Sequence, residues 1–236
     1  MSVWRSARLV ERLEQSATGR TLLFDVARWP GHLAGQHVDV RLTGDDGYHA
    51  VRSYSLAGAA SGTGLELGVQ AVPGGEVSPY LAQQLPIGAE VEVRGPLGGW
   101  FVWRPEQEDP ILLVAGGCGV VPLMAMIRTH RLSGSAAPMR LVYSVRDPDQ
   151  VWYRDELTAG AAENSATALV YTRGAPRGSA RPPGRVTADD LMPPRGAGQR
   201  PLLCYVCGPT GFVEHAANLL TDAGHAPDRI RTERFG

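Results

Sequence analysis

The chain has 236 residues, of which 43% are hydrophobic and 20% charged, a composition that excludes a chain disordered throughout. Its 23 basic and 24 acidic residues leave a formal net charge of -1, so we expect no general attraction to nucleic acid. Every basic residue is an arginine, which excludes chemistry that needs a lysine, such as a Schiff base or a P-loop.

The three cysteines are Cys118, Cys204 and Cys207. They are too few for a disulfide framework or for the four thiolates of an iron-sulfur cluster. Cys204 and Cys207 form a C-x-x-C pair, but on a strand they would point to opposite faces, so we expect no metal site. No stretch has the roughly 18 apolar residues of a membrane span, and the first residues lack an apolar signal core. These absences predict a cytoplasmic protein without membrane insertion.

The first hundred residues read as short strands separated by turn residues. Residues Leu65, Leu67 and Val69 alternate with other residues, as in a half-buried strand. Six such segments indicate an antiparallel barrel. One helix is expected here, at residues 78–85, with Ser78 as its N-cap. The expected strands are 5–15, 21–28, 37–42, 48–57, 65–72 and 89–94.

The pattern of apolar and polar residues changes after a charged, proline-flanked connector at residues 104–110. A continuous apolar run at 111–115 is typical of a strand buried on both faces, and a glycine-rich turn and a helix at 122–131 follow it. Strands alternating with helices indicate a doubly wound parallel sheet. We therefore expect two domains, a six-stranded antiparallel β-barrel at 1–104 and an α/β parallel-sheet domain at 110–236. The later strands are expected at 140–145, 168–172 and 202–207, with a long surface connection at 173–200.

The glycine-rich turn at 115–122, AGGCGVVP, lies between a buried strand and a helix. Dinucleotide fingerprints require this context, because glycines let the backbone approach a pyrophosphate and the helix start attracts its charge. Pro122 replaces the third glycine and suits the first helical position. The alternative is a glycine-rich turn that binds nothing.

Two further candidate anion sites lie in the barrel half. Arg52 could bind a phosphate bidentately, and the ring of Tyr54 offers a stacking face. A second glycine turn at 74–78 leads into the expected helix at Ser78. Two phosphate sites in the barrel and one in the sheet predict two bound nucleotides.

Six motifs now stand in order along the chain. They are R-x-Y-S at 52–55, G-x-V-S at 75–78, G-P-x-G at 95–98, G-x-G-x-x-P at 117–122, C-G-P at 207–209 and E-x-F-G at 233–236. Together they resemble the ferredoxin-NADP reductase family of flavoprotein oxidoreductases, and the resemblance covers nearly the whole chain.

The resemblance implies roles for individual residues. Arg52 would pair with the flavin pyrophosphate, and Tyr54 would pack on the flavin. Catalytic roles fall to Ser55 near the flavin N5, Cys207 beside the nicotinamide C4, and Glu233 on the same hydride path. A small buried hydrophobe is the alternative for Cys207. Without an R-G-G-S motif, the flavin would be FAD rather than FMN. The other implied cofactor contacts are Ser53, Val69, Gly75, Val77, Ser78, Gly117, Gly119, Pro122, Gly208, Pro209 and Phe235.

The choice between NADPH and NADH depends on the strand ends. Ser144 lies near the end of the strand at 141–145 and Arg146 directly after it, and Arg173 directly follows the strand at 169–172. Serine and arginine at strand ends suit a 2′-phosphate, which favours NADPH. NADH stays an alternative donor because of Asp147, since an acidic residue in this region can bind the ribose 2′-hydroxyl.

The resemblance implies a monomeric FAD-dependent reductase that passes electrons from NAD(P)H to a separate acceptor, such as a ferredoxin, a flavodoxin or an oxygenase. Two alternatives stay open: a diaphorase that uses free flavin, and an electron-transfer subunit or nucleotide sensor active only in a complex. Arg177, Arg181 and Arg185 form a run without acids on the long connection. This run could dock an acidic partner or be a solvated loop.

Overall fold

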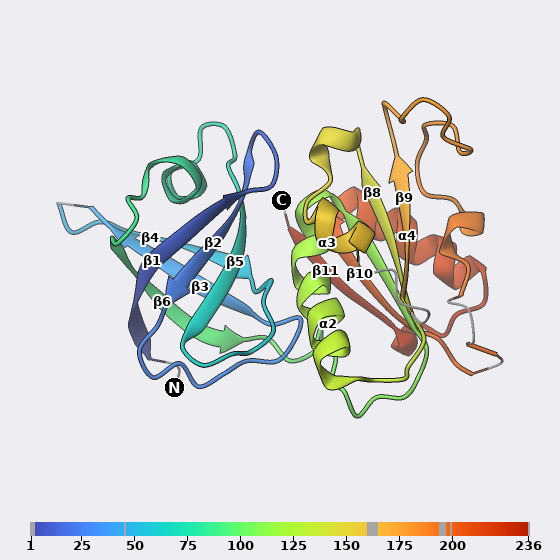
Figure 1. Cartoon of the computed structure of the whole chain (residues 1–236), viewed down its shortest axis with the longest axis horizontal. Coiled ribbons are helices and arrows are strands. Elements are labelled where there is room, and N and C mark those ends of the chain that lie inside the picture. The colour runs from blue at the N-terminus through green and yellow to red at the C-terminus, as the bar shows by residue number, and fades with distance from the viewer. Residues whose placement is uncertain (1–2, 45, 160–164, 194–196, 199, 236) are drawn as a thin grey trace.

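The computed structural model describes residues 3–44, 46–159, 165–193, 197–198 and 200–235. It has two sheets side by side, with helix α2 between them (Figure 1). The N-terminal half forms one sheet and the C-terminal half the other.

The predicted six-stranded antiparallel barrel is confirmed. Its strands are ordered β4-β3-β6-β1-β2-β5. A bridge between Leu56 and Leu67, together with a hydrogen bond from the amide of Ala57 to the carbonyl of Glu66 (2.8 Å), joins the chain after β4 to β5 and closes the barrel. Fully buried aliphatic side chains fill its interior. The strands are β1 (Trp4–Glu14), β2 (Gly19–Asp25), β3 (His37–Thr43), β4 (His49–Ser55), β5 (Gly64–Gln70) and β6 (Glu90–Leu97).

The helix after β5 starts differently from the expectation. It consists of α1 (Val77–Pro79) and a π-helical turn, η1 (Tyr80–Gln84). Glu76 is its N-cap residue, without a side-chain capping bond, so the prediction of Ser78 as N-cap is wrong. The Ser78 hydroxyl instead accepts a hydrogen bond from the amide of Val72 (3.1 Å). The serine therefore closes the turn before the helix rather than capping the helix.

The second sheet is parallel throughout, in the order β11-β10-β7-β8-β9. The sequence did not indicate β11, because the edge strand IRTERF has no continuous apolar run. The strands are β7 (Ile111–Gly116), β8 (Met139–Val145), β9 (Ser165–Tyr171), β10 (Leu203–Pro209) and β11 (Ile230–Phe235).

Helices cover both faces of this sheet. Leu113 and Tyr205 pack in the cluster that includes α2 (Val120–Ser133) and α3 (Arg154–Ala159). Their neighbours along the strands pack in the cluster that includes α4 (Thr210–Asp222). The doubly wound arrangement is thus confirmed. Short 3₁₀ turns are η2 (Gly117–Gly119), η3 (Pro148–Gln150), η4 (Ala188–Leu191) and η5 (Pro227–Arg229).

The two domains share a core. Ala34, Ala57 and Phe101 from the barrel side pack in the same buried cluster as α2. Gly68 on β5 lies so close to α2 that a Cβ there would be 2.2 Å from the side chain of Val121. Helix α2 is therefore packed on both sides, against its own sheet and against the barrel.

The long connection after β9 is partly built into the domain. Val186 and Leu191 are buried, and the Arg181 guanidinium binds both carboxylate oxygens of Asp190 at 2.8 Å. The run has no acid of its own, but Asp190 folds back onto Arg181, so this arginine is paired within the chain. Within the described ranges, no helix has the length and apolar character to cross a membrane.

Candidate functional site

The end of β4 carries the R-x-Y-S motif. Tyr54 is half-buried against the barrel core, and burial raises the pKa of its hydroxyl to about 12, so it stays protonated. Arg52 is exposed and donates to the carbonyl of Val51 (2.8 Å). Ser53 points to the other side of the strand, where its hydroxyl donates to Asp39 (2.7 Å). Arg52 and Tyr54 are thus available to a ligand, whereas the Ser53 hydroxyl is used within the barrel wall.

The second glycine turn lies next to this motif in the barrel. Gly75 is exposed, and its amide donates to the carbonyl of Val72 (3.0 Å). Val77 and Val69 are 2% and 0% exposed in the barrel core. Their side chains therefore support the turn and the strand from beneath, and only their backbone groups can face a ligand.

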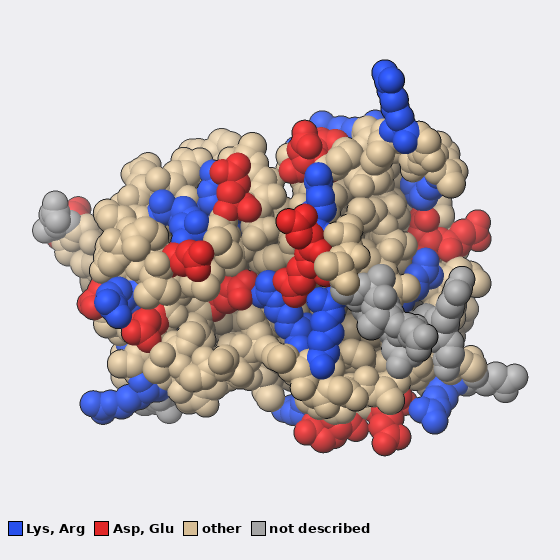
Figure 2. Space-filling model, in the orientation of Figure 1, with Lys and Arg blue, Asp and Glu red and all other residues tan. Residues whose placement is uncertain are grey.

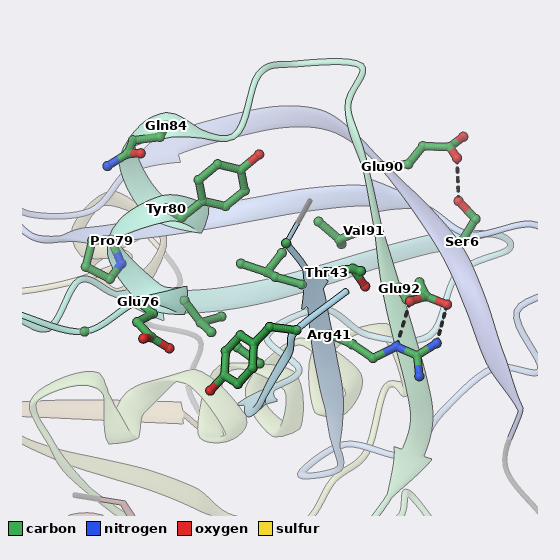
Figure 3. A pocket seen from close by; sticks show the side chains of 16 residues that line it. Ser6, Arg41, Thr43, Glu76, Pro79, Tyr80, Gln84, Glu90, Val91 and Glu92 are labelled. Carbon is green, nitrogen blue, oxygen red and sulfur yellow. Dashed lines mark hydrogen bonds and ion pairs between the residues drawn. The ribbon is translucent and has the colours of Figure 1, made fainter. Parts of the chain in front are cut away.

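A cavity of about 720 Å³ opens beside the turn (Figure 3). Glu76 and Tyr80 border it on one side and Thr43 on another, while Arg41 is held by Glu92 through two hydrogen bonds of 2.7 and 2.5 Å. The remaining lining residues are Ser6, Leu42, Gly44, Tyr48, Ala50, Gly75, Val77, Pro79, Gln84, Glu90 and Val91.

The glycine-rich turn of the sheet domain joins β7 to α2. Gly117 has a φ of +55° with nothing within 4 Å of a Cβ placed there, so its backbone is open to a ligand. A Cβ on Gly119 would lie 2.2 Å from the carbonyl oxygen of Cys207. The helix starts at Val120, so the placement of Pro122 in the first helical position is wrong. Pro122 is the third helical residue, and its missing N–H still costs nothing because the first turn leaves these groups unpaired.

Cys207, Gly208 and Pro209 form the end of β10, beside that turn. Cys207 is fully buried, and burial, followed by the nearby Glu233 and Cys118, raises the pKa of its thiol well above the usual value. Cys204 packs with the cluster on the opposite face, as the strand alternation predicts. The parallel register places Cys207 opposite Glu233 and Pro209 opposite Phe235.

Ser55 and Glu233 meet across the domain junction. The Ser55 hydroxyl favours the ionised form of the carboxyl group and so acts to lower the pKa of Glu233. Burial is the larger effect and raises the pKa of Glu233 to about 7. The three residues with implied catalytic roles thus form one group: Ser55 lies close enough to Glu233 to affect its pKa, and Glu233 stands opposite Cys207 in the sheet.

The strand ends of β8 and β9 bring two arginines together. The amide of Arg173 donates to the carbonyl of Arg146 (2.9 Å), and both residues are exposed. Ser144, near the end of β8, is only 6% exposed. The carboxylate of Asp147 accepts from the amide of Asp149 (3.1 Å) and caps η3.

Sequence reasoning missed His37. It lies opposite Ser55 in the β3–β4 ladder, and a Cβ on Gly98 would lie 3.2 Å from its Nδ1. Burial lowers the pKa of His37 below the usual value, and Asp39 partly opposes this. Positions that pair in a hairpin lie at equal distances from its turn. Counting from the turn between β3 and β4 would therefore have indicated His37 as the partner of Ser55.

Two domain families match the chain. Residues 6–102 match the oxidoreductase FAD-binding domain, and residues 113–218 match the oxidoreductase NAD-binding domain. The first match spans the antiparallel sheet, and the second spans the parallel sheet except for β11.

Individual relatives agree with the domain matches. The ferredoxin–NAD(P)(+) reductase component of naphthalene 1,2-dioxygenase/salicylate 5-hydroxylase systems from Ralstonia sp is 35% identical over 206 residues, covering 85% of this chain and 60% of that protein. The toluate 1,2-dioxygenase electron transfer component of Pseudomonas putida is 28% identical, covering 86% and 58%. A cytochrome P450 reductase structure from Amycolatopsis has a TM-score of 0.84 at 26% identity, covering 99% and 70%.

The chain spans about 60% of the length of the first two of these relatives. The chain belongs to the ferredoxin-NADP reductase family of flavoprotein oxidoreductases, with an FAD-binding barrel and an NAD-binding parallel-sheet domain.

Proposed function

We propose that the protein is an FAD-dependent NAD(P)H reductase that passes electrons to a separate redox protein. The observation that carries the proposal is the group of Ser55, Glu233 and Cys207, which joins the FAD-binding barrel to the NAD-binding domain. The relatives named as reductase or electron transfer components of oxygenase systems support a separate acceptor.

The barrel residues fit a flavin with a second nucleotide half. Along β4, the aromatic ring of Tyr54 is followed by the exposed guanidinium of Arg52 and then by Ala50, which lines the cavity. A ring, a pyrophosphate and an adenosine would match this order, because guanidinium groups bind phosphates bidentately. The cavity of about 720 Å³ gives room for the adenosine half, which FMN lacks.

A bound FAD would supply the redox chemistry that links a two-electron hydride donor to one-electron acceptors. The chain's own residues would orient the two nucleotides and bind or release one proton. Cys207 is a neutral thiol that is fully buried, so it packs beneath the end of β10 and supports the site from within the sheet domain. Glu233, with a pKa of about 7, can bind or release a proton near neutral pH, and the Ser55 hydroxyl connects it to the barrel side.

The decisive experiment is anaerobic mixing of the purified yellow protein with NADPH or NADH. The flavin band near 450 nm should bleach rapidly, and its return on addition of a ferredoxin or another one-electron acceptor should identify the acceptor class. A colourless protein that reduces added free flavin would support the diaphorase alternative. A yellow protein that neither nucleotide bleaches would contradict the proposal and favour a sensor.

We further propose NADPH as the preferred donor. Arg146 and Arg173 lie at adjacent strand ends and could both contact a 2′-phosphate, while Asp147 is used in capping η3. The variants Arg146→Ala and Arg173→Ala should each raise the KM for NADPH about tenfold or more, as expected for loss of a charge-assisted contact, with little effect on NADH.

The matched control is Arg177→Ala, which removes another exposed arginine of the following connection and should leave both KM values unchanged. Equal effects of Arg146→Ala and Arg173→Ala on the two nucleotides would refute the assignment.

A further inference from the structure

The guanidinium of Arg128 forms an ion pair across the junction between the two domains. Arg128 on α2 reaches Glu66 on β5 of the barrel (2.6 Å) and the carbonyl of Ala57 (3.0 Å). On its other side it binds Glu156 on α3 through contacts of 2.7 to 3.1 Å. Among the described residues, Arg128 and Glu66 form the only ion pair between the barrel and the parallel-sheet domain.

The environment makes this pair stronger than an ordinary surface ion pair. The side chains of Arg128 and Glu66 are 21% and 22% exposed, so solvent screens their charges only in part. The ring of Tyr153 lies 5.1 Å from the guanidinium carbon. Figure 2 shows acidic and basic side chains mixed over the junction between the barrel and α2 and α3.

Helix α2 connects Arg128 to the glycine-rich turn at 116–119, called the dinucleotide turn from here on. The helix begins at Val120, directly after that turn, and Val121 contacts the barrel at Gly68. Arg128 follows Val121 by two turns, or about 10 Å along the axis. Strand β5 thus meets α2 at both points, through Gly68 and through Glu66. Because a helix is stiff over this length, holding these two points fixes the direction of its N-terminal end.

We propose that Arg128 is a positioning residue for hydride transfer: through Glu66 it holds α2, and with it the dinucleotide turn, in the orientation that brings a nicotinamide to the flavin. The inference rests on the proposed reductase function. Hydride transfer is sensitive to small displacements of the reacting groups, so a looser α2 lowers the transfer rate without removing either nucleotide site.

The test compares two isosteric variants, Glu66→Gln and Glu156→Gln. Each removes one carboxylate partner of Arg128, but only Glu66 belongs to the barrel. The limiting rate of flavin bleaching at saturating NADPH, measured by stopped flow, should fall about fivefold in Glu66→Gln, as expected for the loss of a partly buried ion pair from a two-state equilibrium. It should change less than twofold in Glu156→Gln.

Salt provides a second readout that a merely structural role would not move. Raising NaCl from 0.05 to 0.5 M should slow bleaching in the wild type towards the rate of Glu66→Gln, whose own rate should stay nearly constant. An unchanged limiting rate in Glu66→Gln, or an equal fall in both variants, would overturn the proposal.

A third readout does not depend on activity. Small-angle X-ray scattering of the FAD-loaded proteins should give a larger radius of gyration for Glu66→Gln than for the wild type or Glu156→Gln, and equal values would count against the proposal. Arg128→Lys keeps the charge but loses the planar fork, and it should behave like Glu66→Gln in scattering. If the wild type is not bleached at all, the reductase function fails, while scattering still decides whether Arg128 orients the domains.

Discussion

Glu233 is the residue whose ionisation is most affected by its surroundings near neutral pH. Its pKa rises from 4.5 to about 7, mainly through burial. Between these values the folded protein holds a proton that the unfolded chain has lost. The free energy of unfolding therefore falls as the pH rises through this window.

The variant Glu233→Gln should remove this pH dependence. At pH 8 it should be more stable than the wild type by about 1 kcal/mol, a value reduced from the full shift because the side chain is only half-buried. At pH 4, where the wild-type carboxyl is protonated in both states, the two proteins should be equally stable. Urea unfolding at both pH values measures the difference.

Glu214→Gln is the matched control, because the Glu214 side chain is 57% exposed. It should leave the pH dependence unchanged. If Glu233→Gln follows the wild-type pH profile, the raised pKa of Glu233 is wrong.

At the scale of elements, the close approach of α2 to β10 depends on Gly119. Gly119→Ala would place a methyl group 2.2 Å from the carbonyl oxygen of Cys207, which is backbone and cannot rotate away. We expect a loss of about 2 to 3 kcal/mol in stability, typical of overpacking in a core. We also expect weaker NADPH binding, because the helix start moves. Chemical denaturation and nucleotide titration measure the two effects.

Gly211→Ala serves as the control for this prediction. Gly211 lies in the first turn of α4, with nothing within 4 Å of a Cβ there. Alanine favours a helix over glycine, so this variant should be as stable as the wild type or slightly more so. A Gly119→Ala protein with unchanged stability would show that the turn can adapt.

The sequence predicted those elements whose signals are local. Apolar runs indicated β7 and β8, and alternation with turn residues indicated the barrel strands. It did not indicate β11, which pairs with one neighbour only and carries charged residues. The predicted start of α1 was wrong because the Ser78 hydroxyl can accept a hydrogen bond either from the helix that follows it or from the turn before it. Only the folded turn selects the amide of Val72.

The site was predictable to a different degree. The family motifs implied Ser55, Cys207 and Glu233, but Ser55 lies more than 150 residues before the other two in the chain. The proximity of Ser55 to Glu233 depends on how the two domains pack, and that of Cys207 to Glu233 on the pairing of β10 with β11; no local pattern encodes either. The same holds for Arg128, whose partners Glu66 and Glu156 come from different domains. In the sequence it reads as an ordinary arginine on a helix.

At the scale of the whole molecule, the shared core predicts that the two domains unfold together. Trp152, which is 3% exposed, lies directly on the barrel, because a Cβ on Gly19 would be 2.1 Å from its ring. The hydroxyl of Thr21 also donates to that of the adjacent Tyr153 (3.2 Å). The wild type should therefore give one calorimetric transition.

The variant Trp152→Ala should lose about 3 to 5 kcal/mol, as large aromatic truncations in cores do, and its transition should broaden or split in two. Trp100→Ala is the control, because Trp100 is 60% exposed, and it should cost less than about 1 kcal/mol. A single sharp transition in Trp152→Ala would mean that the remaining contacts suffice to couple the domains.

The position of β11 at the edge of the parallel sheet has a consequence for motion. Glu233 belongs to β11, one of the two edge strands of the sheet, whereas Cys207 belongs to β10, which is paired on both sides. Edge strands open locally at a smaller free-energy cost than central ones. Amide hydrogens of β11 should therefore exchange with deuterium sooner than those of β10. In the proposed reductase, Glu233 can then adjust to each bound nucleotide while β10 keeps Cys207 in place.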